Sequence, residues 1–514
     1  MRSKSLRHPT FAPLSNLKAL AGQTFWYGLS NIGGRLITYL LTPFLTHILT
    51  GPVGQLEYGR YSLIYLYLPL LNVLYSYGME TAFFRYAKAE NRDTLYNTQG
   101  TSLLLSTLLF SLALIVATGP VSSLLHLEAH PEYVGWCAAI IALDALCILP
   151  NALLREQNRP KRYAFTRIAG IVVFAGFIVA AFTWGGALAA RMPGSWFADF
   201  YKKHWGVGFI LMGNILQNLA TLVLLFPQLR KWRPTLDKAL LRKVLIYGGP
   251  ILVTGFAGVM NDTLNRAMFD WLHPGSKAEN LREQGIFGAA IRLAIMIQLA
   301  IQAFKMSAEP FFFSLAAKGN PQPTYARVMK WFVIVLAAMF LSVALFLDIW
   351  KHFVGPEYRD ALGLVPVMLM SYVFLGIYYN LAVWYKLTDK TRYGAYIMLL
   401  GAGITVAINL AFIPRYGYAA CAWSMLVSYA AMMLLSYWLG QRHYPIPYPV
   451  RRIGLYLAAV VVLYAAQWSV MQATASVPVR MASGIVLLGV FGALVFRQER
   501  SELKSLPVVG KYLR

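Results

Sequence analysis

Charged and amide side chains lie deep inside two long apolar segments, 247–272 and 285–313. Each segment exceeds the roughly 20 apolar residues that are needed to cross a bilayer. An ionised group that faces lipid costs several kcal/mol, so these side chains must face other helices or water. We therefore expect a polar cavity inside a membrane bundle. The candidates for its lining are Asn261, Asp262, Asn265 and Arg266 in the first segment, and Arg292, Gln298, Gln302, Lys305 and Glu309 in the second.

Two of the basic residues have an acid at helical spacing. Asp262 and Arg266 are four residues apart, and so are Lys305 and Glu309, so the members of each pair share a helix face. One interpretation is a buried ion pair in each case. The other is a cavity whose cations attract an anionic substrate and whose carboxylates take part in ion coupling. The spacing alone leaves both interpretations open.

The first expected span carries a polar stripe that begins with Asn31 and Arg35 and continues through three threonines to Thr46. Arg35 has no acid nearby in the sequence, so local pairing does not explain it. It lies about 15 Å from the inner end of the helix, at 1.5 Å per residue, and so close to the expected midplane. The guanidinium of Arg35 is the strongest single candidate for contact with an anion.

The second and fourth expected spans add three further candidates. Tyr65 and Asn72 lie on or near one face of the second span, where a tyrosine ring and hydroxyl suit a sugar. A tyrosine in such a position can equally serve as an interface anchor. For Asp144 in the fourth span, the sequence leaves three roles open. They are a coupling-ion site, a packing partner for Arg35 and an interfacial residue.

The composition indicates an all-α polytopic membrane protein. Of 514 residues, 58% are hydrophobic and only 13% are charged, which exceeds what a soluble domain needs. We expect about 14 transmembrane helices. They lie near residues 25–49, 59–79, 99–117, 134–150, 165–182, 207–226, 245–272, 285–304, 328–347, 362–385, 394–413, 419–439, 453–471 and 482–497.

The net charge of +25 reflects topology rather than nucleic-acid binding. Most of the 46 Lys and Arg residues fall in the terminal segments and in alternate loops, including the very basic link 227–243. The positive-inside rule then places both termini in the cytoplasm. Lys238 and Arg442 should be cytoplasmic, and Glu128 and Ser276 should be outside. Attraction to anionic membrane lipids is a second effect of the same charge.

No catalytic or metal-binding constellation stands out. The three cysteines lie inside expected spans without paired spacing, so neither a disulfide nor a metal site is indicated. No acid pair or nucleophile suggests an enzyme, and no cofactor is expected. The histidines of the outer loops, such as His126, His130 and His204, look scattered and are interpreted as loop residues.

An internal repeat divides the chain into two lobes of six spans. Glu57–Tyr61 (EYGRY) precedes the second span and Glu283–Phe287 (EQGIF) precedes the eighth, and three further matches follow at similar offsets. Six spans is an even number, so both lobes have the same orientation, which implies a pseudo-two-fold axis along the membrane normal. We expect an N-lobe at 1–239, a C-lobe at 240–443, and two more spans with a basic tail at 444–514.

Four segments resemble polysaccharide-export flippases of the multidrug/oligosaccharidyl-lipid/polysaccharide exporter superfamily. They are Gly59–Ser62 (GRYS), Gly78–Arg85 (GMETAFFR), Gly285–Arg292 (GIFGAAIR) and Gln302–Pro310 (QAFKMSAEP). The resemblance covers about residues 20–440. It implies that the chain flips a polyprenyl-pyrophosphate-linked oligosaccharide to the outer leaflet for cell-surface polysaccharide such as lipopolysaccharide. It also implies that polysaccharide polymerase machinery is a partner.

The resemblance implies roles for three residues. Basic side chains in the central cavity of similar flippases attract the pyrophosphate, which suggests Arg35, Arg266 and Arg292 here. The alternatives are a flippase for lipid-linked peptidoglycan precursor and a cation-coupled multidrug antiporter of the same superfamily. An antiporter would need a cavity carboxylate in the first lobe, where the first span has Arg35. A membrane glycosyl-polymerase or ligase would usually carry a large outer loop, which the chain lacks.

Overall fold

The structure is a computed structural model that describes residues 33–34, 36–37, 39–87, 89–316, 321–388, 390 and 392–505. Within these ranges, some side chains between 254 and 262, between 306 and 314, and at 503–505 are not described. The described residues form helices joined by short loops and contain no strand, so the expected all-helical fold is confirmed.

Eleven helices in the described part of the chain are long and apolar enough to cross a membrane. They are α4 (Arg92–Val116), α6 (Glu132–Glu156), α7 (Pro160–Thr183), α10 (Val207–Leu224), α13 (Lys277–Ala316), α14 (Gln322–Ala344), α16 (Val365–Leu381), α18 (Arg392–Tyr416), α19 (Tyr418–His443), α20 (Val450–Ala473) and α21 (Val477–Ser505).

Two further long helices are not among these eleven. They are α2 (Gly51–Ser76) and α12 (Lys238–Leu272), which occupy the places of the second and seventh expected spans. The first expected span lies partly outside the described residues, and its described part is helical up to Ile48. Both α2 and α13 begin earlier than expected, so the repeated EYGRY and EQGIF segments lie inside these helices instead of preceding them.

Polar residues fix the ends of several helices. The Asn91 side chain accepts hydrogen bonds from the backbone N–H groups of Asp93 and Thr94, both at 3.0 Å, and so caps α4. The Asp237 carboxylate accepts from the N–H of Leu240 at 3.0 Å and caps α12. This cap places the start of α12 at the end of the basic link 227–237, where the sequence puts the boundary between the lobes.

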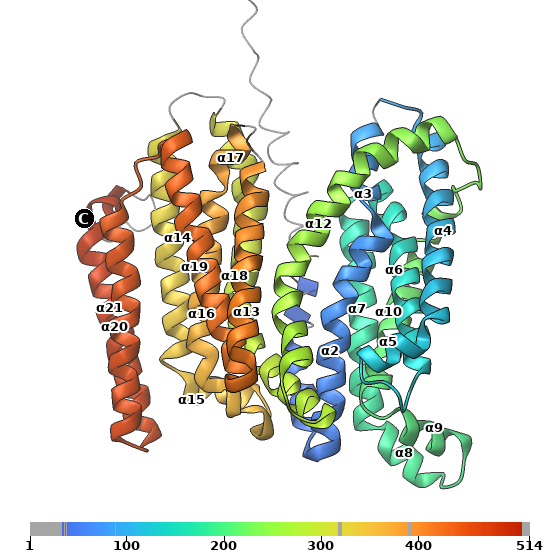
Figure 1. The fold of residues 1–514 in the computed structure, drawn as a ribbon, viewed down its shortest axis with the longest axis horizontal. Coiled ribbons are helices and arrows are strands. Elements are labelled where there is room, and N and C mark those ends of the chain that lie inside the picture. Colours follow the sequence, from blue (N-terminus) through green and yellow to red (C-terminus); the bar gives the residue numbers. More distant parts are fainter. Residues whose placement is uncertain are drawn as a thin grey trace, which may run out of the picture.

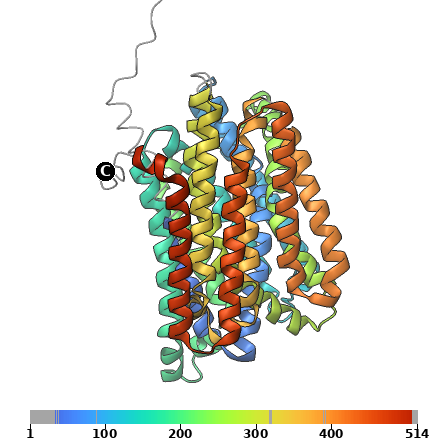
Figure 2. The ribbon, with the colours of Figure 1, turned by 90° about the vertical axis from the view of Figure 1, so that its left-hand side faces the viewer.

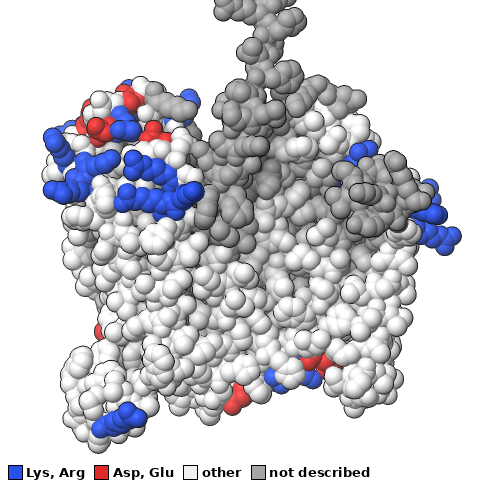
Figure 3. Space-filling view, turned by 180° about the vertical axis from the view of Figure 1, so that it is seen from behind, with Lys and Arg blue, Asp and Glu red and all other residues white. Residues whose placement is uncertain are grey.

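The bundle has two distinct ends. Short helices mark what we call the loop end, at the bottom of Figure 1: α5 (Thr118–Leu124), α8 (Gly185–Arg191), α9 (Trp196–His204), α15 (Leu347–Trp350) and the 3₁₀ turns η1 (Lys351–Phe353), η2 (Pro356–Tyr358) and η3 (Asp360–Leu364). The opposite, basic end carries α3 (Met79–Tyr86), α11 (Phe226–Leu229) and α17 (Val383–Leu387). Lys and Arg gather at this end, above a broad band with almost no charge (Figure 3).

The long helices fall into two groups with α2, α12 and α13 between them (Figure 1). One group contains α4, α6, α7 and α10, and the other contains α14, α16, α18 and α19. Helix α12 joins the groups, because it contacts α3 and α4 of the first group and α18 and α19 of the second. The hairpin α20–α21 lies on the outside of the second group, against α14 (Figure 2).

The two groups meet closely at the loop end. Helices α2 and α13 pack backbone to backbone there, and the loop before α6 reaches α12 and the start of α13. His126 Nε2 lies 3.0 Å from a carboxylate oxygen of Asp270, and Lys277 Nζ lies 2.6 Å from a carboxylate oxygen of Glu128. These contacts close the loop end of the space between the groups.

Candidate functional site

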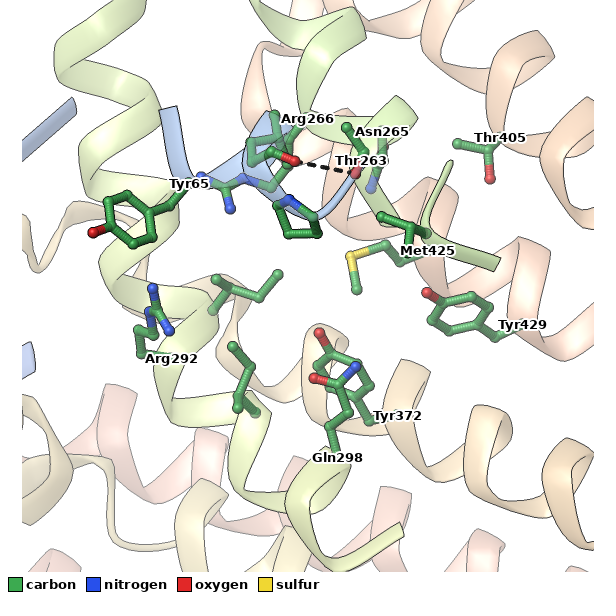
Figure 4. Close-up of a pocket in the computed structure, with 15 residues that line it drawn as sticks. Tyr65, Thr263, Asn265, Arg266, Arg292, Gln298, Tyr372, Thr405, Met425 and Tyr429 are labelled. Carbon is green, nitrogen blue, oxygen red and sulfur yellow. Dashed lines mark hydrogen bonds between the residues drawn. The ribbon is translucent and has the colours of Figure 1, made fainter. Parts of the chain in front are cut away.

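A cavity of about 360 Å³ lies among α2, α12, α13 and the second group of helices (Figure 4). Such a volume is within the range of small-molecule sites in proteins. Six helices contribute to it: α2, α12, α13, α16, α18 and α19. The residues that line it are Tyr65, Leu66, Pro69, Val259, Thr263, Asn265, Arg266, Ile291, Arg292, Ile295, Gln298, Tyr372, Thr405, Met425 and Tyr429.

Arg266 reaches this cavity from α12. Its Nη2 donates to the Ser62 hydroxyl at 2.5 Å and lies 3.4 Å from the Ser62 carbonyl oxygen. Its Nε is buried and meets no hydrogen-bond partner among the described residues. The backbone carbonyl of Arg266 accepts from Gln284 Nε2 at 3.0 Å, which fixes α12 against α13 at this level. The guanidinium is therefore held in place while one N–H is left without a partner.

Arg292 reaches the cavity from α13, on the same side as Arg266 (Figure 4). Its Nη2 lies 3.5 Å from the Tyr61 hydroxyl, and its side chain also hydrogen-bonds to Tyr58. The rings of Tyr61 and Tyr65 lie 4.7 Å apart, centroid to centroid. Tyrosines of α2 thus hold the Arg292 side chain by hydrogen bonds.

The two arginines lie within electrostatic range of each other. The other titratable groups that act on either of them are tyrosines and one cysteine, and no described carboxylate is among them. Two partly buried cations that lack an acidic partner repel each other, and the repulsion is stronger in a medium of low dielectric. A phosphate-type anion between them would relieve the repulsion, and guanidinium forks suit its oxygens. Among the described residues, the arrangement is one that can bind an anion.

The opposite wall of the cavity is aromatic and hydroxylated. Tyr372 and Tyr429 are both buried and point toward the space, with Gln298 beside Tyr372 (Figure 4). The Thr405 hydroxyl lies 2.7 Å from the hydroxyl of Ser428. Flat rings next to hydroxyl and amide groups can stack on and hydrogen-bond to a sugar. The cavity therefore joins a cationic side to a side that is suited to carbohydrate.

The structure brings together only some of the residues that the sequence singles out. Arg266, Arg292 and Tyr65 line one cavity, as expected. The Tyr65 hydroxyl accepts a hydrogen bond from Asn214 Nδ2 of α10 at 2.7 Å, so the first group of helices holds this ring. Lys305 lies nearer the basic end and outside the cavity, with its Nζ 4.7 Å from the centre of the Tyr379 ring.

Asn72 and Asp144 form a second site that does not line the cavity. The Asn72 side chain hydrogen-bonds to the carboxylate of Asp144, which also lies within electrostatic range of Arg167. All three side chains are half-buried. Arg167 was not predicted as a site residue. Like Arg266, it is a charged residue inside an expected span, so the same signal could have identified it. Asp144 of α6 thus lies beside an amide of α2 and a cation of α7.

Five of the expected site residues lie outside what the structure describes. Asn31 and Arg35 fall on positions that it leaves out, and the side chains of Asn261, Asp262 and Glu309 are not described. Conversely, Tyr372, Thr405 and Tyr429 line the cavity but were not predicted from the sequence. Nothing in their local pattern distinguishes them from other residues of apolar helices, because only the packing of α16, α18 and α19 turns them toward the arginines.

Solved structures of known proteins have a similar fold. The lipid II flippase MurJ in an inward closed conformation has a TM-score of 0.68 at 11% identity, over 92% of this chain and 99% of that one. An inward-facing multidrug resistance transporter of the MATE family has a TM-score of 0.59 at 11% identity, over 84% and 96%. A MATE transporter from Vibrio cholerae has a TM-score of 0.55 at 14% identity, over 83% and 97%.

These similarities confirm the two-lobe transporter fold. No curated protein sequence matches the chain significantly. A sequence model described as "Polysaccharide biosynthesis protein" matches residues 20–316, which is more than half of the chain and includes α2, α12 and α13. The chain therefore belongs to the polysaccharide biosynthesis protein family.

Proposed function

We propose that this protein is a flippase that moves a polyprenyl-pyrophosphate-linked oligosaccharide from the inner to the outer leaflet. One observation carries the proposal: Arg266 and Arg292 face one cavity between the lobes, and no described carboxylate pairs with either. A pyrophosphate is a dianionic group whose oxygens match two guanidinium forks. The family membership supports a lipid-linked saccharide as the cargo.

The two parts of such a substrate need different surroundings. The polyprenyl tail can stay in the lipid while the charged, sugar-bearing head crosses through the protein. Moving the head through hydrocarbon without a hydrated or cationic route would cost far more than thermal energy provides. A cavity with arginines on one side and tyrosine, threonine and glutamine on the other accommodates both the pyrophosphate and the sugars next to it. The two lobes would then open alternately to the two leaflets.

The direction of transport follows from charge. We place the basic end and both termini in the cytoplasm of a bacterium, following the positive-inside rule. The closed loop end then faces outward, and the described state receives substrate from the inside. An inside-negative membrane potential favours outward movement of an anionic head, by about 2.3 kcal/mol per charge per 100 mV. The product would be delivered to a polysaccharide polymerase at the outer face.

Two alternatives make different demands on the cavity. A lipid-linked peptidoglycan precursor carries the same pyrophosphate, so it differs only in the sugar part of the site. A multidrug antiporter takes lipophilic cations, and two arginines with no acidic partner among the described residues repel such a cargo. The cationic cavity therefore favours a pyrophosphate-linked substrate over a drug.

Complementation of a flippase-deficient strain tests the proposal. Expression of the protein should restore surface glycan, and the lipid-linked precursor that accumulates without it identifies the sugar. Arg266→Ala and Arg292→Ala should lose export at normal protein levels, whereas Arg451→Ala, on an exposed arginine at the basic end, should not. Efflux of lipophilic cations driven by a sodium or proton gradient, without glycan export, would contradict the proposal.

A further inference from the structure

Three side chains with metal-ligand chemistry meet at the loop end, far from the cavity. His130 and Glu132 lie at the start of α6, and His204 is the last residue of α9. The ligand atoms that these three side chains offer all lie within 4.8 Å of one another. From the sequence, the histidines of these loops look scattered. For His130 and His204 this interpretation is wrong, because their ligand atoms lie close together. The fold of the first group of helices brings them together.

We infer that His130, Glu132 and His204 form a site for a divalent transition-metal ion of the zinc class. Two imidazoles and one carboxylate, with a water in the fourth position, are a common ligand set for Zn²⁺. Tetrahedral bonds of 2.0–2.1 Å place ligand atoms about 3.3 Å apart. His130 Nδ1 and Glu132 Oε1 are already 3.4 Å apart. The third ligand must move closer by an amount that side-chain rotation can supply.

The two imidazoles are held by a common neighbour. The Tyr133 ring stacks on His130 with centroids 4.9 Å apart and planes at 16°. The Tyr133 hydroxyl also lies 3.2 Å from Nδ1 of His204. When this hydroxyl accepts the Nδ1–H, the Nε2 lone pair of His204 is free for a metal, and such outer partners orient metal-binding histidines in proteins generally.

Close packing around His204 limits its freedom further. Its side chain is 5% exposed, and its ring lies 5.0 Å from that of Trp136 and 4.6 Å from that of Phe200, between centroids. A Cβ atom on Gly208 would lie 2.6 Å from the Tyr133 hydroxyl and 2.9 Å from the Cβ of His204, so only glycine allows this approach. A histidine held in this way has already lost most of the side-chain entropy that metal binding would cost.

One cation already competes for the carboxylate. Lys203 Nζ lies 3.0 Å from Glu132 Oε1, the same oxygen that faces His130. A metal ion must displace this ammonium group. Lys203 is exposed and flexible enough to leave, because its side chain is more than half accessible. Removing Lys203 should therefore strengthen metal binding.

The position of the site gives the ion a structural role. It would tie the loop before α6 to the end of α9, and that loop also carries His126 and Glu128, which contact Asp270 and Lys277 across the lobes. A bound ion would thus stiffen the segment that closes the loop end. This consequence concerns the fold and holds whatever substrate the cavity takes.

Metal titration of the purified full-length protein tests the inference. The protein is prepared in detergent without a histidine tag, stripped with a chelator and titrated with ZnCl₂ and, separately, with CoCl₂. We expect one equivalent of bound metal, a visible absorption spectrum of tetrahedral Co²⁺, and a higher midpoint of thermal unfolding with Zn²⁺. His130→Ala, His204→Ala and Glu132→Gln should each weaken binding by at least about tenfold.

Matched variants separate the site from general effects. Lys203→Ala should bind Zn²⁺ several-fold more tightly than wild type. His352→Ala, on an exposed histidine of the same end, should bind as wild type does. Because His204 is buried, His204→Ala could fail to fold, and Glu132→Gln, on a half-buried side chain, keeps the test valid. Absence of stoichiometric binding in wild type, or unchanged binding in Glu132→Gln and His130→Ala, would overturn the inference.

Discussion

Gly59 of α2 and Gly285 of α13 lie against each other where the two lobes meet at the loop end. A Cβ atom on Gly285 would lie 3.1 Å from the backbone nitrogen of Gly59, and one on Gly59 would lie 2.0 Å from the carbonyl oxygen of Leu281. The two glycines occupy equivalent positions of the EYGRY and EQGIF repeats. The repeat therefore places two small residues at the contact between the lobes.

This contact predicts that Gly59→Ala separates α2 from α13. The new methyl group meets backbone that cannot move aside. The substitution should therefore lower the free energy of unfolding by about 1–3 kcal/mol, the usual range for overpacking. We expect a lower midpoint of thermal unfolding in detergent and loss of transport. The control is Gly176→Ala in α7, where an added Cβ meets nothing within 4 Å. Equal stability of Gly59→Ala and wild type would show that the close approach is absent in solution.

Much of this arrangement was predictable from sequence because the signals are local. Runs of apolar residues mark the helices, and charged residues inside such runs mark Arg266 and Arg292 as residues that need a polar surrounding. The starts of α2 and α13 were missed because their first turns carry polar residues that look like loops. The pairing of Asn72 with Asp144, and of His130 with His204, depends on how separate helices pack, and no local pattern encodes that.

The Glu128–Lys277 contact predicts a pH dependence of stability. The hydrogen bond from Lys277 holds the pKa of Glu128 below its ordinary value of 4.5. The pair therefore contributes its full stability above about pH 4.5, and the contribution is lost as the pH falls through the lower folded-state pKa. Glu128→Gln should lower the midpoint of thermal unfolding slightly at pH 7, and the difference from wild type should vanish in acid. The effect is small because both side chains are exposed. A difference that persists in acid would show that another interaction is responsible.

A buried ion-pair network predicts how the C-terminal hairpin is attached. Lys330 of α14 is 3% exposed and lies 2.5 Å from a carboxylate oxygen of Glu499, which is fully buried. Glu499 also meets Arg452 at 3.2 Å and accepts from the Tyr456 hydroxyl at 2.7 Å. Lys330→Met removes one cation from beside a buried carboxylate. It should lower the free energy of unfolding by about 3–5 kcal/mol.

The release of the α20–α21 hairpin by a protease measures how firmly this network holds it. Limited proteolysis should free the α20–α21 segment from Lys330→Met at a temperature where wild type is resistant. Arg500→Ala, on an exposed side chain next to Glu499 in the chain, should behave as wild type does. If Lys330→Met and wild type are equally resistant, the network does not hold the hairpin.

The separation of the two ends predicts the topology. Lys238 begins α12 and Arg442 lies near the end of α19, both at the basic end, whereas Glu128 and Ser276 lie in loops at the other end. Single cysteines at Lys238 and Arg442 should react with membrane-impermeant maleimides only in opened cells. Cysteines at Glu128 and Ser276 should react in intact cells. An external signal from Lys238 would contradict the two-lobe arrangement in the membrane.

We propose that Arg266 and Arg292 bind the pyrophosphate of a lipid-linked saccharide. The most direct measurement is flipping of a fluorescent polyprenyl-pyrophosphate-linked sugar by the purified protein in vesicles. Wild type should flip it and should flip the monophosphate analogue more slowly. Arg266→Gln and Arg292→Gln should each reduce the rate by about tenfold or more, since a hydrogen bond to a charged group contributes about 1.5–3 kcal/mol. Wild-type rates from both variants, at equal amounts of monodisperse protein, would contradict the account.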